Sequence, residues 1–432
     1  MKSLLSVLVL GVSCAAMATP DVSDVSMNAA VGKRVSISYT LTGEPAVITF
    51  DVVTNGVSIG RDRIRSYSGD VAVRVEADGR RHQIVWDSAA DFPGGVFRDA
   101  RAVVTAWPTN SPPNYMVVEL ETGDVKYYAG EEDLPFAGGV TNDLCKTSYI
   151  VMRKIPARGV VWTMGAEAYE ARLLGTGGVS ENATREIPHR VVLTDDFYIG
   201  VFEVTARQWM NVVGNLSDVY SSRQNMKSAA AGPWFECIRG ATAAYDWPKN
   251  GHDVDENGFL GLLRDRVSSV LFDLPTEAEW EFACRAGTQT AFNSGKNISD
   301  INHLDVEFNE VGWYYNNSLD ESGNKRYYPV EVGQKLPNAW GLYDMHGNMG
   351  EWCLDWYVEG DDYRATFAND AGTPCVNPKG PQTGAQRVRR GGGINMAVGS
   401  ERSASRDSSA PSRPSSLSYQ IGFRLWAPAN AK

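Results

Sequence analysis

Basic residues and histidines are scarce in this 432-residue chain. Lysine and arginine total 41 against 52 aspartates and glutamates, so the formal net charge is −11 and nucleic acid is excluded as an expected partner. The five histidines are scattered, without the H-x-x-x-H or H-E-x-x-H spacing of zinc and iron sites. The chain also lacks a P-loop and a G-x-S-x-G elbow. The sequence therefore excludes the commonest metal-hydrolase, nucleotide and serine-hydrolase sites.

The first 18 residues predict an export signal. A positive charge precedes a short apolar run at 4–12, and an A-M-A string at 16–18 fits a cleavage site. That run is too short for a stable anchor, and no later stretch approaches about 18 consecutive apolar residues, so we expect no transmembrane segment. Lipidation at Cys14 is the less favoured alternative, because Gly11 stands where a larger aliphatic residue is usual. We expect 1–18 to be a signal peptide and the mature protein to be secreted or periplasmic.

Cysteine is also sparse, and its spacing matches neither a C-x-x-C redox motif nor a zinc site. Removing the leader leaves five cysteines: Cys145, Cys237, Cys284, Cys353 and Cys375. An odd number in an oxidising compartment permits at most two disulfides and leaves one free thiol. Structural disulfides or buried thiols are the favoured interpretation.

Residues 22–107 predict a small all-β module of the immunoglobulin-like sandwich type. Apolar side chains alternate along 35–41, 48–52 and 71–75, which is typical of half-buried strands. Asn55-Gly56, between two apolar runs, predicts a type I′ hairpin turn. This region carries no catalytic constellation, so we expect an accessory or adhesion module.

Residues 108–147 predict a connector. Pro108, Pro112 and Pro113 interrupt the pattern, and only 115–120 reads as a strand.

Two helices are predicted further along the chain by capping boxes, in which two side chains each satisfy a backbone N–H of the first turn. The first box pairs Thr205 with Gln208, and the second pairs Thr276 with Glu279.

Beyond residue 148 the chain carries seven distinctive strings in a fixed order. They are V-W-T-M-G at 161–165, D-F-Y-I-G with E-V-T at 196–205, L-P-T-E-A-E-W-E-F-A at 274–283, N-A-W-G-L-Y-D-M-H-G-N at 338–348, E-W at 351–352, R-G-G-G at 390–393 and G-F-R-L at 422–425. The series resembles the sulfatase-modifying factor family, whose founding activity is the oxidation of a sulfatase cysteine to formylglycine. The resemblance covers residues 148–428.

The resemblance implies a loop-rich α+β fold related to C-type lectins, with a structural Ca²⁺ site. By resemblance, Asp344 and Glu351 would supply side-chain oxygens, and Gly347 and Met349 backbone carbonyls. Oxygen ligands suit Ca²⁺, and glycine lets the chain fold tightly enough for carbonyls to converge. The alternative is that Asp344 caps a turn and that Glu351 pairs with a buried arginine such as Arg390.

The family's catalytic cysteine pair is absent. Relatives that make formylglycine carry two cysteines shortly after an R-G-G-S-like turn, and their thiolates hold Cu(I), a soft ion. Here Met396 stands where the first cysteine belongs, and Glu401 is the nearest counterpart of the second. One thioether cannot replace two thiolates, which argues against copper and against a sulfatase substrate, and we assign no catalytic residue. A redox pair relocated to Cys284 and Cys353 is less favoured than buried thiols or a disulfide.

The rewritten segment after the glycine turn supplies polar side chains suited to ligand binding, since arginines recognise anions and small polar groups adapt. The candidate ligand-binding residues are Asn395, Met396, Glu401, Arg402, Arg406 and Asp407. The favoured function is an exported, calcium-stabilised pseudoenzyme that binds a glycan or a protein. The alternatives are an enzyme of altered chemistry in the same cleft, or a genuine sulfatase-modifying enzyme that acts without the cysteine pair.

Overall fold

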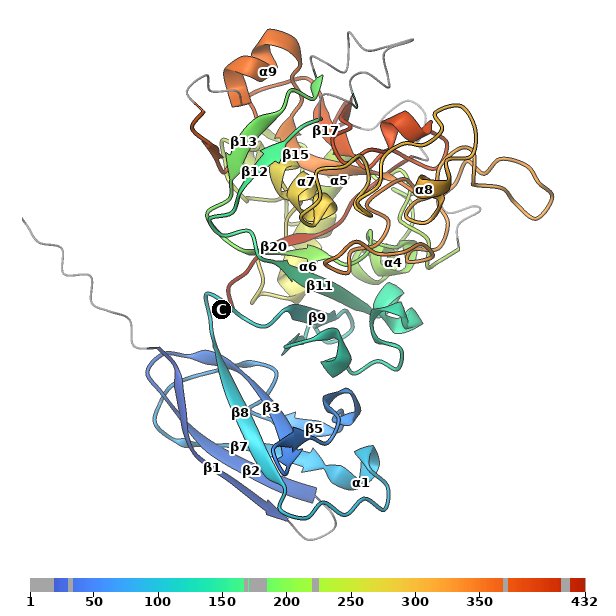
Figure 1. Ribbon diagram of the computed structural model, residues 1–432. Helices are drawn as coiled ribbons and strands as arrows, with labels where there is room; N and C mark the ends of the chain where they lie inside the picture. Colours follow the sequence, from blue (N-terminus) through green and yellow to red (C-terminus); the bar gives the residue numbers. More distant parts are fainter. Residues whose placement is uncertain are drawn as a thin grey trace, which may run out of the picture. The chain divides into compact units, whose positions relative to one another are not determined.

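The computed structural model describes residues 19–29, 34–166, 170, 185–219, 225–367, 372–412 and 420–431 (Figure 1). The predicted signal peptide and Cys14 lie outside these residues. The chain divides into two compact units, unit 1 with residues 1–60 and 66–109, and unit 2 with residues 61–65 and 110–432. Among the described residues, no helix combines the length and apolarity needed to cross a membrane.

Unit 1 is built from two antiparallel sheets. The first has the order β1 (Asp21–Ala29), β2 (Arg34–Thr42), β7 (Arg81–Asp87), β5 (Tyr67–Gly69), and the second joins β4 (Val57–Ser58), β3 (Ala46–Thr54), β6 (Arg74–Val75) and β8 (Arg101–Pro108). A short helix, α1 (Ser88–Asp91), follows β7. Along β2 every second residue is buried, as the alternation predicts, so Ile37, Tyr39 and Leu41 enter the core. The immunoglobulin-like assignment of this unit stays a prediction.

The turn between β3 and β4 confirms the predicted type I′ hairpin. Asn55 and Gly56 have φ values of 52° and 79°, and Thr54 pairs with Val57 across the turn. A type I′ turn needs positive φ at both central residues, which asparagine and glycine adopt most readily.

Unit 2 mixes short strands with short helices. Its five-stranded sheet has the order β10 (Val125–Tyr128), β9 (Tyr115–Glu119), β11 (Tyr149–Ile155), β14 (Phe197–Gly200), β20 (Trp426–Pro428). A three-stranded sheet joins β12 (Val161–Met164), β13 (His189–Val192) and β16 (Cys375–Val376). A four-stranded sheet has the order β18 (Asp407–Ser409), β17 (Arg387–Arg390), β15 (Gly350–Trp356), β19 (Ile421–Gly422).

The helices of unit 2 are one to three turns long. They are α4 (Ala206–Val213), α5 (Phe235–Arg239), α6 (Phe259–Arg266), α7 (Glu277–Arg285), α8 (Val306–Asn309) and α9 (Gly360–Phe367). Both predicted capping boxes are confirmed, at the start of α4 and of α7, with each side chain bonded to the other residue's N–H. Helix α7 packs against β15 and β17, which places it beneath the site described below (Figure 1).

The segment 108–147, expected to be a connector with one strand at 115–120, supplies two strands of the five-stranded sheet. β9 pairs with both β10 and β11, and four of its five residues are buried. The strand expected at 115–120 is therefore confirmed, but its context is not. The prolines just before β9 do not break the unit: the carbonyls of Pro112 and Pro113 accept hydrogen bonds from Lys154 and from the Tyr198 hydroxyl.

Candidate functional site

A cleft of about 380 Å³ lies over β17 and the segment that follows it. Of the six predicted ligand-binding residues, Met396, Arg406 and Asp407 line this cleft, and Asn395, Glu401 and Arg402 do not. The segment that follows the glycine turn at 390–393, where the sequence departs from the family pattern, therefore borders an open cavity.

Two glycines allow the backbone to approach closely at the cleft. A Cβ atom on Gly350 would lie 2.9 Å from the carbonyl oxygen of Gly392, well inside normal contact. Gly392 has φ +81°, and a Cβ there would collide with the Glu401 carboxylate. Glycine at both positions is thus required by the packing between the first residue of β15 and the turn after β17.

Arg389 and Asp407 form an ion pair on the lining of the cleft. They sit opposite each other in the antiparallel pairing of β17 with β18, which brings their side chains together. The Arg389 side chain is 15% exposed and that of Asp407 46% exposed. The Nε of Arg389 is buried without a hydrogen-bond partner among the described residues. This pair is one partly exposed polar feature of the cleft lining, and Arg185, with a side chain that is 33% exposed, is another.

Arg406 contributes to the cleft from a buried position. Its Nη2 donates to Glu277 at 2.7 Å, and its Nη1 donates to the carbonyls of Arg185 at 2.9 Å and Val358 at 2.8 Å. The guanidinium also lies 4.5 Å from the centre of the Tyr363 ring. Its charge is therefore balanced by Glu277 inside the protein.

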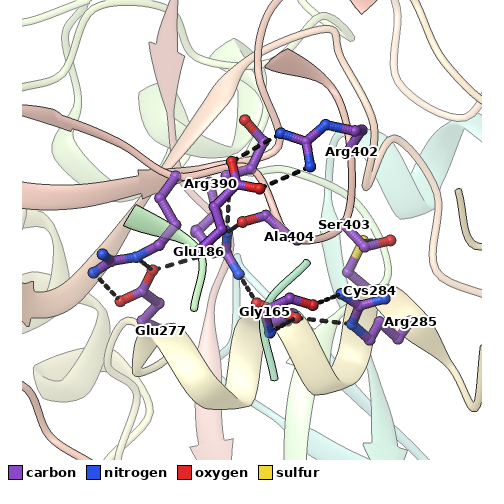
Figure 2. A network of polar contacts seen from close by, with 12 residues as sticks. Gly165, Glu186, Glu277, Cys284, Arg285, Arg390, Arg402, Ser403 and Ala404 are labelled. Atoms are coloured by element: carbon purple, nitrogen blue, oxygen red, sulfur yellow. Dashed lines mark hydrogen bonds and ion pairs between the residues drawn. The ribbon is translucent and has the colours of Figure 1, made fainter. Parts of the chain in front are cut away.

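Arg402 is not a surface residue, so the prediction that it recognises a ligand is wrong. Its side chain is 1% exposed and donates two hydrogen bonds to Glu186, at 2.7 and 2.8 Å, and a third to Glu170 at 2.7 Å (Figure 2). Its Nε donates to the carbonyl of Gly399 at 2.8 Å. Arg402 therefore supports the cleft from a buried position, since it binds the carbonyl of the lining residue Gly399.

Glu401 is buried as well. Its carboxylate accepts the N–H of Gly393 at 3.1 Å, and burial raises the pKa of this carboxyl well above its usual value. Its backbone carbonyl accepts a hydrogen bond from Nδ1 of His346 at 2.7 Å. Asn395 is half-buried, with an Oδ1 that lacks a hydrogen-bond partner among the described residues. Both residues shape the turn and neither lines the cavity.

A network of buried ion pairs fixes the cleft from beneath (Figure 2). Glu281 on α7 pairs with Arg285 one turn later, at 2.8 Å, and with Arg390 at the end of β17. Arg390 also donates to the carbonyl of Ala404 at 2.8 Å, which ties the strand to the returning chain. Because breaking a buried pair is costly, this network holds the segment 390–406 in one conformation.

The predicted calcium ligands lie in a separate, fully buried region. Glu351 forms a two-point ion pair with Arg424, at 2.6 and 2.5 Å, and accepts the indole N–H of Trp280 at 2.6 Å. The alternative that Glu351 pairs with a buried arginine is therefore confirmed, although that arginine is Arg424 and not Arg390. Asp344 accepts the N–H of Gly333 at 2.6 Å through Oδ2, whereas its Oδ1 is buried and has no hydrogen-bond partner in the described part of the chain.

These residues fit a cation in part. The Oδ1 of Asp344, which has no hydrogen-bond partner among the described residues, is available to bind a cation. The Glu351 carboxylate has about four lone-pair positions and accepts three hydrogen bonds, so one position is left for a cation. Glu203 is a third buried carboxylate. Its pKa is raised mainly by burial and further by the negative charges of Asp344 and Glu351. Among the described residues no three His, Cys, Asp or Glu side chains lie close enough together to hold a metal ion. The predicted calcium site, however, uses only two such side chains together with two backbone carbonyls.

The cysteines offer no substitute for the missing pair. All five in the described residues are free, and Cys284 and Cys353 are buried in one core cluster. The Cys284 sulfur lies 3.8 Å from Nε2 of His346, but that nitrogen accepts the N–H of Asn293 at 3.0 Å. Burial raises the pKa of Cys284 to about 12 and lowers that of His346 to about 4. The arrangement therefore disfavours a reactive thiolate at Cys284.

Two arginines of the cleft lining, Arg185 and Arg389, were not predicted from the sequence. Arg389 is the least buried of the four residues of β17, but a period of two does not distinguish it from Arg387, which shares its face and is buried. Arg185 carries no local signal, since it reaches the cleft only through the tertiary fold.

Comparison with known proteins places these features in a family. Residues 156–428, more than half the chain, match the sulfatase-modifying factor enzyme 1-like domain. The formylglycine-generating enzyme of Mus musculus is 27% identical over 290 residues, covering 61% of this chain and 71% of that protein. The enzyme of the same name from Streptomyces coelicolor is 34% identical over 213 residues, covering 46% and 62%. A protein of Paenibacillus barcinonensis named chaperone protein LppX is 29% identical over 210 residues, covering 43% and 71%.

Among solved structures, Treponema denticola variable protein 1 aligns with a TM-score of 0.44 at 23% identity, covering 65% of this chain and 95% of that chain. The seven ordered strings, the cleft beside the altered segment and the match over 156–428 lead to one assignment. The chain belongs to the family of the formylglycine-generating enzymes, the sulfatase-modifying factors.

Proposed function

We propose that this protein is an exported, non-catalytic binding module whose cleft recognises an anionic group on a glycan or a protein. The observation that carries the proposal is the chemistry of the cleft: a thioether, Met396, stands beside arginines and one carboxylate, and no cysteine lines it. Without a thiolate the cleft has no group that could hold Cu(I) and exchange with a substrate thiol.

Charge favours an anionic ligand. The lining contains three arginines, Arg185, Arg389 and Arg406, against the single carboxylate of Asp407. Arg406 is neutralised by Glu277 and Arg185 pairs with Glu359 at 2.7 Å, whereas Arg389 pairs with the half-exposed Asp407 and its Nε has no hydrogen-bond partner within the described residues. A ligand carboxylate or sulfate would compete with Asp407 for this guanidinium, whose planar fork suits such groups.

Preorganisation favours binding as well. The ion pairs of α7 with Arg390 and Arg406 fix the cleft before any ligand arrives, so little conformational entropy is lost on association. A relative is named a chaperone protein, and chaperones act by binding other proteins. This is consistent with a glycan or protein ligand rather than a small substrate.

The test is a binding screen with the full mature chain against arrays of acidic glycans and acidic peptides. Arg389→Ala removes one partly exposed cation of the lining, and Ser400→Trp fills the cleft. Both are expected to weaken binding at least about tenfold, and the wild-type affinity is expected to fall with ionic strength. Lys296→Ala, which changes a surface charge paired with Glu307, is the matched control and is expected to bind normally. Binding that survives both cleft variants would overturn the proposal.

We also propose that a structural Ca²⁺ binds Asp344 and Glu351, with the carbonyls of Gly347 and Met349. Its support is the Asp344 oxygen that has no hydrogen-bond partner among the described residues, and the three buried carboxylates Glu203, Asp344 and Glu351 that lie near the cation of Arg424. Bound calcium would supply charge neutralisation only, and no step of ligand binding passes through it.

A further inference from the structure

A second cleft, of about 600 Å³, lies elsewhere on unit 2 and has a different character. Its lining brings together three aromatic side chains, Trp313, Tyr327 and Tyr328, with the aliphatic Leu319 and the amide of Gln334. Pockets that bind small organic groups combine apolar walls with a few polar groups in this way.

The apolar side chains of this cleft are unusually exposed. Tyr327 is 53% and Leu319 46% exposed. Both line the cleft and belong to the exposed large hydrophobic side chains of the described residues. Exposed apolar side chains that share one cleft suit a ligand with an apolar face.

The charges of the cleft are balanced and already partnered. Lys325 and Arg326 face Asp320 and Glu331 in the lining, two of each sign. Lys325 donates from Nζ to the carbonyl of Tyr315 at 2.6 Å, and Asp320 accepts the N–H of Asn324 at 2.8 Å. Glu331 accepts from Lys146 at 3.2 Å. Each of these groups is hydrogen-bonded within the protein, since Nε of Arg326 also donates to the carbonyl of Leu319 at 2.8 Å, and two charges of each sign give the lining no net charge to attract an ionic ligand.

We propose that this second cleft binds a neutral carbohydrate. A pyranose ring has an apolar C–H face that can lie against an aromatic ring, and a rim of hydroxyls that amides can hydrogen-bond. Tyr327 is the stacking platform in this assignment, because it is the most exposed ring of the lining, and Gln334 and Asn225 are the amides beside it.

The two clefts are joined by hydrogen bonds through the backbone. The N–H of Tyr315 donates to the carbonyl of Met396 at 3.1 Å, and the hydroxyl of Ser318 donates to the carbonyl of Ile394 at 3.1 Å. The loop that borders the second cleft therefore rests on the segment that borders the first. The sites remain chemically distinct, one cationic and one neutral, so variants of each can be tested separately.

The experiment uses the full mature chain on an array of neutral hexose and N-acetylhexosamine oligosaccharides, followed by calorimetric titration of the best binder. Tyr327→Ala is expected to weaken binding at least about tenfold, the effect of removing an aromatic anchor. Leu336→Ala, an exposed apolar residue outside the lining, and Arg389→Ala in the first cleft are both expected to change it less than twofold. Circular dichroism of each variant verifies the fold.

Three results would overturn the inference. The wild type could bind no neutral glycan at millimolar concentration, or Tyr327→Ala could bind as well as the wild type. Proline-rich peptides, which also dock on aromatic grooves, could bind this cleft in place of sugars. If Arg389→Ala loses glycan binding and Tyr327→Ala keeps it, the glycan binds in the first cleft. This inference would then fail, and the proposed function of the first cleft would still stand.

Discussion

Replacing Arg402 by methionine tests whether this residue supports the fold or contacts a ligand. The substitution removes a guanidinium that is 1% exposed, together with its hydrogen bonds to Glu186 and Glu170 and to the carbonyl of Gly399. Two buried carboxylates would then lose their hydrogen bonds to the Arg402 guanidinium. Breaking a buried pair in this way costs about 3–5 kcal/mol, so we expect that loss in the free energy of unfolding of unit 2.

The assay is urea unfolding followed by tryptophan fluorescence, because ten of the twelve tryptophans lie in unit 2. With a slope of about 3 kcal/mol per molar urea, the midpoint of Arg402→Met falls by about 1–2 M. Lys296→Met, which breaks an exposed pair with Glu307, is the control and is expected to cost under about 1 kcal/mol. A loss for Arg402→Met no larger than that of the control would refute the reasoning.

The same variant has a pH signature. Burial raises the pKa of Glu170, and the charge of Arg402 opposes that rise. Without Arg402, the pKa of Glu170 is higher in the folded state than in the unfolded state. Between these two pKa values the folded state therefore binds more protons than the unfolded state. Stability then falls as the pH rises through this window. The loss in free energy of unfolding caused by Arg402→Met is therefore expected to be smaller at pH 5 than at pH 7.5. An equal loss at both pH values would contradict this prediction.

Three further outcomes are expected. Cys284 and Cys353 react with a thiol reagent only after unfolding, since both are buried and burial raises the pKa of each; rapid labelling of the native protein would contradict this. A calcium chelator lowers the melting temperature of the wild type but not of Asp344→Ala; a chelator-insensitive wild type that purifies without calcium would remove the proposed site. Gly392→Ala costs about 1–3 kcal/mol in urea unfolding, because its Cβ collides with Glu401 at positive φ; a neutral effect would show that the turn can relax.

Local features of the fold were predictable from the sequence. The capping boxes at Thr205 and Thr276 and the turn at Asn55-Gly56 each depend on neighbouring residues, and the structure has all three. The ordered strings predicted the family, and the glycine turn led to the segment that borders the cleft.

Long-range partners were not predictable. Arg402 and Arg406 stand in a polar, serine-rich stretch that reads as solvent-exposed, yet each is buried against glutamates more than 100 residues away in the sequence. Glu351 pairs with Arg424, and no periodicity distinguishes that partner from Arg390. Ion pairs of this kind depend on which strands become neighbours, so only the tertiary structure separates an arginine that binds a ligand from one that supports the fold.

The central claim is that the altered cleft binds a ligand and does not oxidise cysteine. The most direct measurement incubates the mature protein with a cysteine-containing sulfatase peptide, Cu(I) and oxygen, and follows the peptide by mass spectrometry. An active formylglycine-generating enzyme serves as the positive control. We expect no formylglycine above the level formed by copper and peptide alone, because Met396 is the only sulfur-containing residue of the cleft lining within the described part of the chain. Formylglycine produced at each turnover by this chain would contradict the claim.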